Sequence, residues 1–281
     1  MIIWLASYPK SGNTFMRSLL SSYYFSKDGN FEFDLLREIQ QFPLTEIFQK
    51  IGVDIKDKYS VSKNYIKAQE EINKSKNVIF LKTHSSFCKL YNKYNFSDLK
   101  NSLGVIYIVR DPRNLVKSIS HHFDFTLDKA CEFLLSPEII GNGKSWEEKK
   151  DGMYNLLGKW NDHYRSWTVN KDHLLLIKYE DLLKDANTQM DRIIDFLKRY
   201  IKFNTNTNKN KNILETTSFK NLQDLERKGK FIENAFSKDM KKINFFHLGP
   251  KNKWEDDLNE NIKKKIENNF RKEMQELGYL D

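Results

Sequence analysis

Residues 2–15 read IIWLASYPKSGNTF, an apolar run followed at once by a short polar loop and the start of a helical pattern. Apolar and β-branched residues on both faces are typical of a buried parallel strand. In the loop, Lys10, Ser11 and Gly12 stand directly before the first helical residue. Glycine lets the backbone approach an anion, amides at a helix start bind it, and lysine adds positive charge. The stretch therefore predicts a strand, a phosphate-binding loop and a helix over Asn13–Phe25.

Apolar runs of the same kind recur along the chain with helical patterns between them, which indicates βαβ units. We therefore predict an α/β fold with buried parallel strands over Ile2–Ser7, Val78–Thr83, Val105–Arg110 and Leu174–Tyr179. Further helices are expected over Arg113–Phe123, Trp146–Trp167, Asp181–Tyr200 and Leu258–Phe270. Asp111 and Pro112 are typical of the N-cap and first residue of a helix.

The length and composition of the chain fit one domain. With 281 residues and 39% hydrophobic content, the chain can bury a sizeable core, and we expect a single domain over 1–281. The segment NTNTNKNKN at 204–212 is polar and of low complexity. Because such a segment has little to bury, we predict a mobile loop there and no domain boundary.

Charge and cysteine content narrow the class of protein. The net charge is +9, but charges of both signs are interspersed, so only the excess favours a polyanionic ligand. Cys88 and Cys131 are the only cysteines, which excludes a disulfide framework or a structural zinc site and favours a reducing compartment. The pair His121–His122 has no further ligand at metal spacing, so we expect no metal site.

The sequence shows neither the pattern of a signal peptide nor an apolar run long enough to span a bilayer. We therefore expect a cytoplasmic protein without a membrane span.

Chemically useful side chains also follow other strands, at the sheet edge where α/β proteins bind ligands. Lys82, Thr83 and His84 end the second predicted strand, and a histidine there can take a proton from an attacking hydroxyl near neutral pH. Arg110 ends the third strand, and Ser118 lies eight residues later, about two helical turns on. Arginine and serine so placed can bind a second phosphate.

These motifs resemble those of the sulfotransferase family, in its cytosolic type, whose members use 3′-phosphoadenosine 5′-phosphosulfate (PAPS). The family's loop reads close to YPKSGTTW and stands here as YPKSGNTF. Its other motifs stand as Lys82-Thr83-His84, as Arg110 with Ser118, as Tyr179 of YED, as Thr217-Ser218-Phe219, and as His247-Leu248-Gly249 before Trp254. Any one motif is weak, but several in the family's order are strong evidence of resemblance.

The resemblance implies a P-loop NTPase-like three-layer fold, with a central parallel sheet flanked by helices, and in-line transfer of a sulfuryl group to a hydroxyl or amine. It implies a catalytic set of His84 as the base, Lys10 at the bridging oxygen, Lys82 at the transferring group, and Ser118. Implied cofactor-binding residues are Lys10, Ser11, Gly12, Asn13 and Thr14 at the 5′-phosphate, Arg110, Ser118, His247, Leu248 and Gly249 at the 3′-phosphate, and Phe15, Tyr179, Thr217, Ser218 and Phe219 near adenine. The family needs no metal.

The sequence departs from the family's pattern at several of these positions. Asn13 replaces a threonine and keeps an amide that can donate, and Phe15 replaces a tryptophan and keeps an aromatic face. His247 and Leu248 replace the Arg-Lys pair that grips the 3′-phosphate, and either Lys251 or Lys253 could compensate from the same loop.

Plainer structural roles stand beside these functional ones. Arg110 could pair with Asp111 or Glu180, Tyr179 could be core only, and Ser218 could simply cap a helix. His121–His122 is interpreted as helix surface and packing.

Two other functions compete with a sulfotransferase. A P-loop kinase wants G-x-x-x-x-G-K-[ST], whereas here the lysine precedes the glycine. A non-catalytic nucleotide or nucleic-acid binder would not need a base such as His84, so we expect no nucleic-acid partner.

The sequence does not name the acceptor. A small molecule, a glycan and a lipid head group stay open, as does the oligomeric state. The segments expected to form the acceptor walls are Phe31–Asp57, Phe87–Phe96 and Asp124–Lys150, because they interrupt the βαβ pattern.

Overall fold

A five-stranded parallel sheet forms the centre of the computed structural model, which describes the chain except residues 142–152, 203–206, 232, 234, 238 and 240. Its strand order is β2-β3-β1-β6-β9. The strands are β1 (Ile2–Ser7), β2 (Gln40–Gln41), β3 (Ile79–Thr83), β6 (Ser102–Val109) and β9 (Leu174–Lys178). All four predicted strands are confirmed, and only the short edge strand β2 was not expected.

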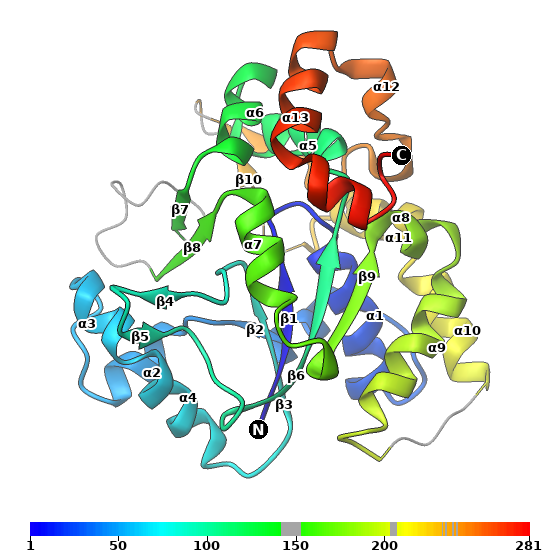
Figure 1. Ribbon diagram of the computed structural model, residues 1–281. Coiled ribbons are helices and arrows are strands. Elements are labelled where there is room, and N and C mark those ends of the chain that lie inside the picture. The colour runs from blue at the N-terminus through cyan, green and yellow to red at the C-terminus, as the bar shows by residue number, and fades with distance from the viewer. Residues whose placement is uncertain (142–152, 203–206, 232, 234, 238, 240) are drawn as a thin grey trace.

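β1 lies in the middle of the sheet and pairs with β3 and β6. Its register joins Leu5 to Lys82 and Ala6 to Thr83 on one side, and Ser7 to Ile108 on the other. All pairings are parallel, so the carboxyl ends meet at one edge, toward the top of Figure 1. This edge receives the side chains that follow β1, β3, β6 and β9.

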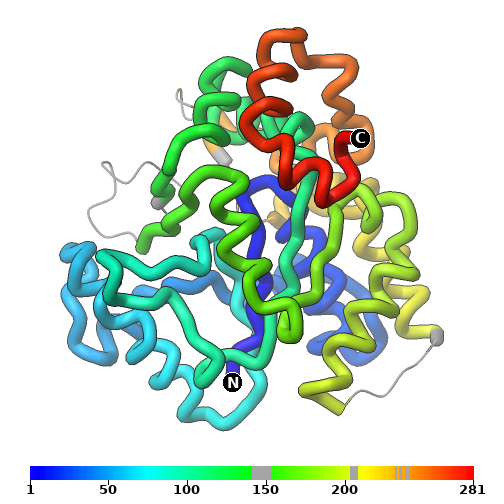
Figure 2. The backbone as a smooth tube through the Cα atoms, viewed as in Figure 1, coloured from blue at the N-terminus to red at the C-terminus, as the bar shows by residue number. Residues whose placement is uncertain are grey.

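Helices cover both faces of the sheet, which gives the predicted three layers (Figures 1 and 2). On one face, Ile3 and Leu5 pack with the helices α1 (Asn13–Phe25), α9 (Ala186–Leu197) and α10 (Thr207–Thr216). On the other, Trp4 and Ala6 pack with the helices α4 (Tyr65–Asn73), α5 (Pro112–Phe123), α7 (Trp160–Trp167) and α13 (Glu260–Glu276). The alternation along β1 follows from the two-residue period of a strand.

Shorter elements complete the described chain. They are η1 (Phe33–Glu38), α2 (Thr45–Lys50), α3 (Lys58–Lys63), β4 (Lys89–Leu90), β5 (Tyr94–Asn95), α6 (Leu127–Leu135), β7 (Glu138–Gly141), β8 (Tyr154–Gly158), η2 (Lys171–His173), α8 (Tyr179–Lys184), α11 (Phe219–Arg227), β10 (Ala235–Phe236), β11 (Lys242–Ile243), η3 (Gly249–Lys251) and α12 (Trp254–Asp257). Among the described residues, no helix combines the length and apolar composition that crossing a lipid bilayer requires.

The predicted helix starts after β1 and β6 are both confirmed. α1 has the predicted bounds. At α5, Pro112 is the first residue and the Asp111 carboxylate accepts a hydrogen bond of 2.9 Å from the Arg113 amide.

The predicted helix over Trp146–Trp167 is confirmed over α7 and wrong over Tyr154–Gly158. Only α7 is helical there, whereas Tyr154–Gly158 forms β8 and pairs antiparallel with β7. Apolar residues in a short hairpin strand also fit a helical spacing, so periodicity alone could not separate the two. The start of this predicted helix lies outside the described residues.

Two further predictions need correction. The expected helix over Asp181–Tyr200 is divided into α8 and α9, because the Asp185 side chain accepts from the Thr188 amide and caps a new helix. The mobile loop predicted at 204–212 is wrong from residue 207 onward, where α10 begins. Ile213 of α10 is fully buried in the core, and this tertiary contact outweighs the polar composition. The rest of the predicted loop includes residues outside those described.

Trp4 is the largest side chain at the centre of the sheet and offers a test of this core. It is 1% exposed, its indole N–H donates to Ser102 Oγ at 2.8 Å, and its ring lies 5.5 Å from the ring of Phe42. Replacing Trp4 with alanine should lower the free energy of unfolding by about 3–5 kcal/mol. Chemical denaturation measures this value.

The control is Val169→Ala, because Val169 is 81% exposed. It should change the free energy of unfolding by less than about 0.5 kcal/mol. Equal effects of the two substitutions would contradict this description of the core.

Candidate active site

A cavity of about 1510 Å³ opens at the carboxyl edge of the sheet. Of the residues predicted to bind cofactor or act in catalysis, it is lined by Lys10, Gly12, Asn13, Thr14, Phe15, Lys82, His84, Arg110, Ser118, Tyr179, Phe219, His247, Leu248 and Gly249. Ser11, Thr217 and Ser218 do not line it. The cavity therefore brings together residues from four strand ends and from the C-terminal third of the chain.

The loop between β1 and α1 has a backbone shape that few residues allow. Lys10 has a φ of 66° and Gly12 a φ of 101°, both in the left-handed region. A Cβ at Gly12 would overlap the ring of Tyr179, so only glycine fits. The Asn13 side chain donates to the Leu5 carbonyl at 3.1 Å and to Ser7 Oγ at 3.2 Å. The side-chain amide of Asn13 therefore fixes the loop. Only the backbone N–H of Asn13 belongs to the amides at the helix start.

The start of α1 is suited to an anion. The first turn contains no acidic residue and no side chain caps it, so its first amides lack intrahelical acceptors. Ser11 is fully buried, and its hydroxyl has no hydrogen-bond partner among the described residues. Unpaired buried donors at a positive helix end together favour a bound phosphate.

Lys10 lines the cavity, and its pKa is strongly lowered. Its Nζ lies 3.7 Å from the centre of the Phe245 ring. Burial, with a smaller contribution from the nearby Arg110, lowers the pKa of Lys10 to about 7. An arriving anion would restore the charge of this lysine, because opposite charge favours the protonated form.

Lys82 belongs to a buried ionic cluster at the end of β3. Its Nζ lies 3.4 Å from both carboxylate oxygens of Glu233. Glu233 also accepts from Arg17 at 2.7 Å, and Arg17 is only 3% exposed. Burial lowers the pKa of Lys82 to about 8, with a further contribution from Arg17, while Lys82 and Arg17 together hold the pKa of Glu233 at about 2 against its burial.

His84 is oriented by the end of β1. Its Nδ1 lies 2.8 Å from the Ser7 carbonyl oxygen, which can only accept. Nδ1 therefore carries the proton, and Nε2 has the free lone pair that a general base needs. Burial, with a contribution from Lys82, lowers the pKa of His84 to about 4, so the ring is neutral at neutral pH.

Arg110 and Ser118 meet at the other end of the cavity. Arg110 donates to the Lys10 carbonyl at 3.0 Å and to Ser118 Oγ at 3.1 Å. Ser118 Oγ also accepts from Asn252 at 3.0 Å, so its own proton is directed elsewhere. The Arg110 guanidinium lies 4.4 Å above the Tyr179 ring, and its buried Nε has no partner within the described part of the chain.

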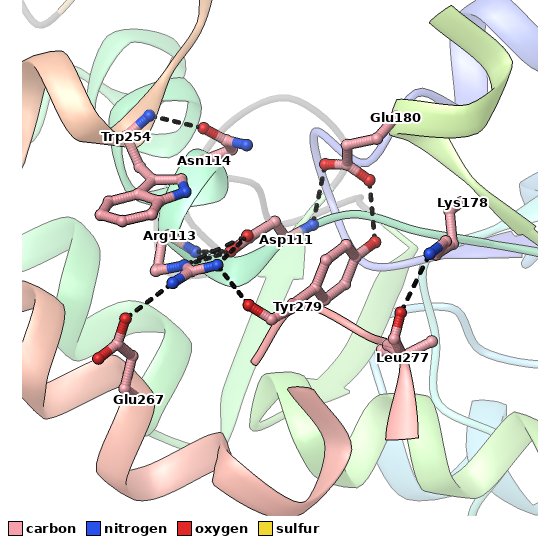
Figure 3. Close-up of polar contacts among 9 residues, drawn as sticks. All are labelled: Asp111, Arg113, Asn114, Lys178, Glu180, Trp254, Glu267, Leu277 and Tyr279. Atoms are coloured by element: carbon pink, nitrogen blue, oxygen red, sulfur yellow. Dashed lines mark hydrogen bonds and ion pairs between the residues drawn. The ribbon is translucent and has the colours of Figure 1, made fainter. Parts of the chain in front are cut away.

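The plainer role considered for Arg110 finds no support among the described ion pairs. Asp111 pairs with Arg113 at 2.7 Å, and Glu180 accepts from the Asp111 amide at 3.1 Å (Figure 3). Both carboxylates thus have other partners, and the guanidinium of Arg110 faces the cavity. Tyr179 is buried and also lines the cavity, so its position is not that of a core residue alone.

Of the aligned segment 217–219, only Phe219 lines the cavity. Thr217 is buried and donates to the Ile213 carbonyl at 2.7 Å. Ser218 caps α11 by accepting from the Asn221 amide. The capping role considered for Ser218 is thus confirmed, and neither hydroxyl reaches the cavity surface.

The comparisons with known proteins decide the family. The sulfotransferase domain family matches residues 2–278. The chain belongs to the sulfotransferase family. Sulfotransferase 2A1 of Rattus norvegicus is 34% identical over 112 residues, covering 38% of this chain and 35% of that protein. The chain thus spans about a third of the length of such curated relatives.

Solved sulfotransferase structures share the fold. Mouse sulfotransferase SULT7A1, complexed with PAP, has a TM-score of 0.58 and 20% identity, and the match covers 97% of this chain and 83% of the mouse chain. Retinol dehydratase, in a complex with retinol and PAP, has a TM-score of 0.60 and 18% identity, with 97% of this chain and 81% of that chain covered. PAP denotes 3′-phosphoadenosine 5′-phosphate.

The sulfotransferase loop at residues 247–249 differs from the family's Arg-Lys-Gly. His247 stacks on His121, with ring centroids 3.9 Å apart, and the pair lines the cavity. Neither Lys251 nor Lys253 lines it, whereas Lys117 does, directly before Ser118. Of these three lysines, Lys117 is therefore the one that lines the cavity beside Ser118 in sequence.

His121 and His122 lie on α5 at the cavity. Both line the cavity, and His121 Nε2 lies 2.9 Å from the Asn244 carbonyl. Within the described ranges, no three His, Cys, Asp or Glu side chains are grouped as metal ligands.

Sequence reasoning missed several residues of this sulfotransferase cavity, notably Arg17, Lys117 and Glu233. Arg17 lies one helical turn after Asn13, so the period of α1 could have placed it on the cavity side. Glu233 contacts Arg17 across 216 residues of sequence, and no local pattern announces it.

The expected acceptor walls contribute both apolar and polar residues to the cavity. Phe31–Asp57 and Asp124–Lys150 contribute to it, whereas no residue of Phe87–Phe96 does. The apolar residues from these two segments are Leu36, Leu44, Phe125, Phe133, Ile139 and Ile140, and the polar ones are Arg37, Gln40, Gln41, Glu46, Lys129, Glu132, Ser136 and Glu138. This part of the lining therefore offers apolar surface beside charged side chains.

The depressed pKa values of Lys10 and Lys82 predict pH-dependent binding of PAP. Because both values are lowered without ligand and rise beside an anion, binding takes up protons above pH 7. PAP affinity should be highest below about pH 7 and fall by roughly tenfold per proton and pH unit between pH 7 and 9. Calorimetry in two buffers of different ionisation enthalpy measures the uptake.

The matched variant is Lys10→Met. It should bind PAP more weakly at pH 6 and lose most of the dependence between pH 7 and 8. Constant affinity of the unaltered protein from pH 6 to 9 would contradict the lowered pKa values.

Proposed function

We propose that this protein transfers a sulfuryl group from PAPS to the hydroxyl of a small, largely apolar acceptor. The observation that carries the proposal is one cavity lined by Lys10, Lys82, His84 and the first residues of α1, with His84 oriented by its Nδ1 contact to the Ser7 carbonyl. An anion site, two lysines and an oriented neutral imidazole are the parts that transfer of an anionic group requires.

The residues present fit such a nucleotide. Two buried donors lack partners among the described residues: Ser11 Oγ, in the loop before α1, and Nε of the cavity-lining Arg110. A 5′-phosphate binds at the first and a 3′-phosphate at the second, where Ser118 has a free proton to donate. Tyr179 and Phe15 offer aromatic faces for the base.

PAPS supplies the activated sulfuryl group, and the chain supplies positioning and charge. His84 Nε2 takes the proton of the acceptor hydroxyl. The hydroxyl oxygen forms the new bond to sulfur as the bond from sulfur to the 5′-phosphate oxygen breaks. Lys10 neutralises the oxygen left on the 5′-phosphate, and Lys82 stabilises the transferring group. The low pKa of His84 keeps its lone pair available before the acceptor binds.

Glu233 bears on the same step. Its carboxylate accepts hydrogen bonds from both Lys82 and Arg17. A sulfuryl group that binds Lys82 must share or replace this carboxylate, since both are anions at one cation.

The aromatic and aliphatic side chains that Phe31–Asp57 and Asp124–Lys150 contribute to the cavity support a hydrophobic alcohol as the acceptor. The retinol named with one structural relative is a molecule of that kind, which supports the same class of acceptor here. We also propose that the protein is a soluble enzyme of the cytoplasm and that it needs no metal ion.

The proposed base is tested by His84→Asn, because asparagine removes the proton acceptor but keeps a side-chain donor near Ser7. Transfer from labelled PAPS to a panel of apolar alcohols, followed by mass spectrometry, should fall at least about 100-fold. PAP affinity should stay within about twofold of the unaltered protein, because His84 is not a phosphate ligand.

The matched control is His173→Asn. His173 has the same kind of bond, from its ring to the Leu103 carbonyl at 2.9 Å, but does not line the cavity. Its transfer rate should be unchanged. Full activity of His84→Asn would remove His84 as the base, whereas PAP binding without transfer to any alcohol would favour a non-catalytic nucleotide-binding protein.

A further inference from the structure

The ends of β6 and β9 diverge where the proposed 3′-phosphate site begins. The last ladder pair is Val109 with Lys178, so Arg110 and Tyr179 are the first residues beyond it. These two stack on each other and line the cavity. No ladder pair joins them: the Arg110 side chain is held by Lys10 and Ser118, Tyr179 begins α8, and the bridge between the two segments comes from the next residues.

Glu180 fixes those next residues. Its Oε1 accepts from the Asp111 amide at 3.1 Å, which bridges the two chain segments directly after Arg110 and Tyr179. Its Oε2 accepts from the Tyr279 hydroxyl at 2.9 Å. Figure 3 shows the carboxylate between the Asp111 amide and the Tyr279 ring. Each oxygen therefore has one donor, and the bridge has a defined orientation.

Tyr279 is itself held from two sides. Besides donating to Glu180, it accepts from Arg113 through its carbonyl oxygen at 2.8 Å. Arg113 also binds Asp111 at 2.7 Å and Glu267 of α13 at 2.7 Å (Figure 3). The C-terminal residues and the two strand ends thus form one continuous polar network.

Two features separate this network from ordinary core packing. Asp111 and Arg113 are buried, at 4% and 6% exposure, and buried ion pairs rarely stabilise a fold more than apolar side chains of similar size. None of Asp111, Arg113, Glu180 or Tyr279 lines the cavity, although two of them directly follow residues that do. A fixed geometry at Arg110 and Tyr179 is what the network provides.

We propose that Tyr279 is a positioning residue for the 3′-phosphate site, acting through Glu180 on the stacked pair Arg110 and Tyr179. The inference rests on the proposed function, because it concerns recognition of the 3′-phosphate. It makes selectivity for nucleotides with a 3′-phosphate a property of the C-terminal segment.

The test compares Tyr279→Phe with Tyr154→Phe. Both remove one tyrosine hydroxyl that donates a hydrogen bond, but the Tyr154 hydroxyl donates to the Lys58 carbonyl and not to the strand ends. Dissociation constants are measured for PAP and for adenosine 5′-monophosphate, which lacks the 3′-phosphate. Tyr279→Phe should weaken PAP binding by about three- to tenfold and the monophosphate by less than about twofold. Tyr154→Phe should leave the ratio of the two constants unchanged.

A merely structural role would weaken both nucleotides equally, and an unchanged ratio in Tyr279→Phe overturns the proposal. Hydrogen exchange of the ligand-free proteins gives a readout independent of the nucleotide. Faster exchange at 110–113 and 179–181 in Tyr279→Phe, but not in Tyr154→Phe, supports the positioning role. Unchanged exchange there overturns it. If the unaltered protein binds neither nucleotide, the proposed function fails, while the exchange result still decides whether Tyr279 holds the strand ends.

Discussion

The contact between Gly12 and the ring of Tyr179 is the constraint on which the cavity depends. A side chain at Gly12 would overlap that ring, so the loop after β1 and the end of β9 can approach only because the residue is glycine. Arg110 then covers the Tyr179 ring and donates to the Lys10 carbonyl, which returns to the same loop. Three strand ends are thereby joined around one anion site.

Electrostatic preorganisation follows from this packing. Lysines and arginines gathered at one sheet edge repel one another and lose hydration, which is why the pKa values of Lys10 and Lys82 are lowered. An enzyme site that is costly to keep charged without ligand binds an anion strongly, because the ligand removes the repulsion. Glu233 reduces part of this repulsion by pairing with Lys82 and Arg17.

Local sequence patterns predicted much of the fold. The four main strands and α1 follow from apolar runs and from the loop residues that end them. The hairpin of β7 and β8 and the helix α10 were not predicted, because short apolar segments fit more than one period and because Ile213 is fixed by packing. Most of the residues that the motifs predicted do line the cavity, since parallel strands carry them to one edge. Glu233 reaches Arg17 and Lys82 through contacts between distant segments, which a single sequence does not reveal.

A crystal structure of the protein with PAP tests the central claim most directly. We predict the 5′-phosphate at the amides of Gly12, Asn13 and Thr14, and the 3′-phosphate at Arg110 and Ser118. Lys10 should leave the face of Phe245 and approach the 5′-phosphate. PAP bound outside this cavity, or in it with the 3′-phosphate away from Arg110, would contradict the assignment of the two phosphate sites.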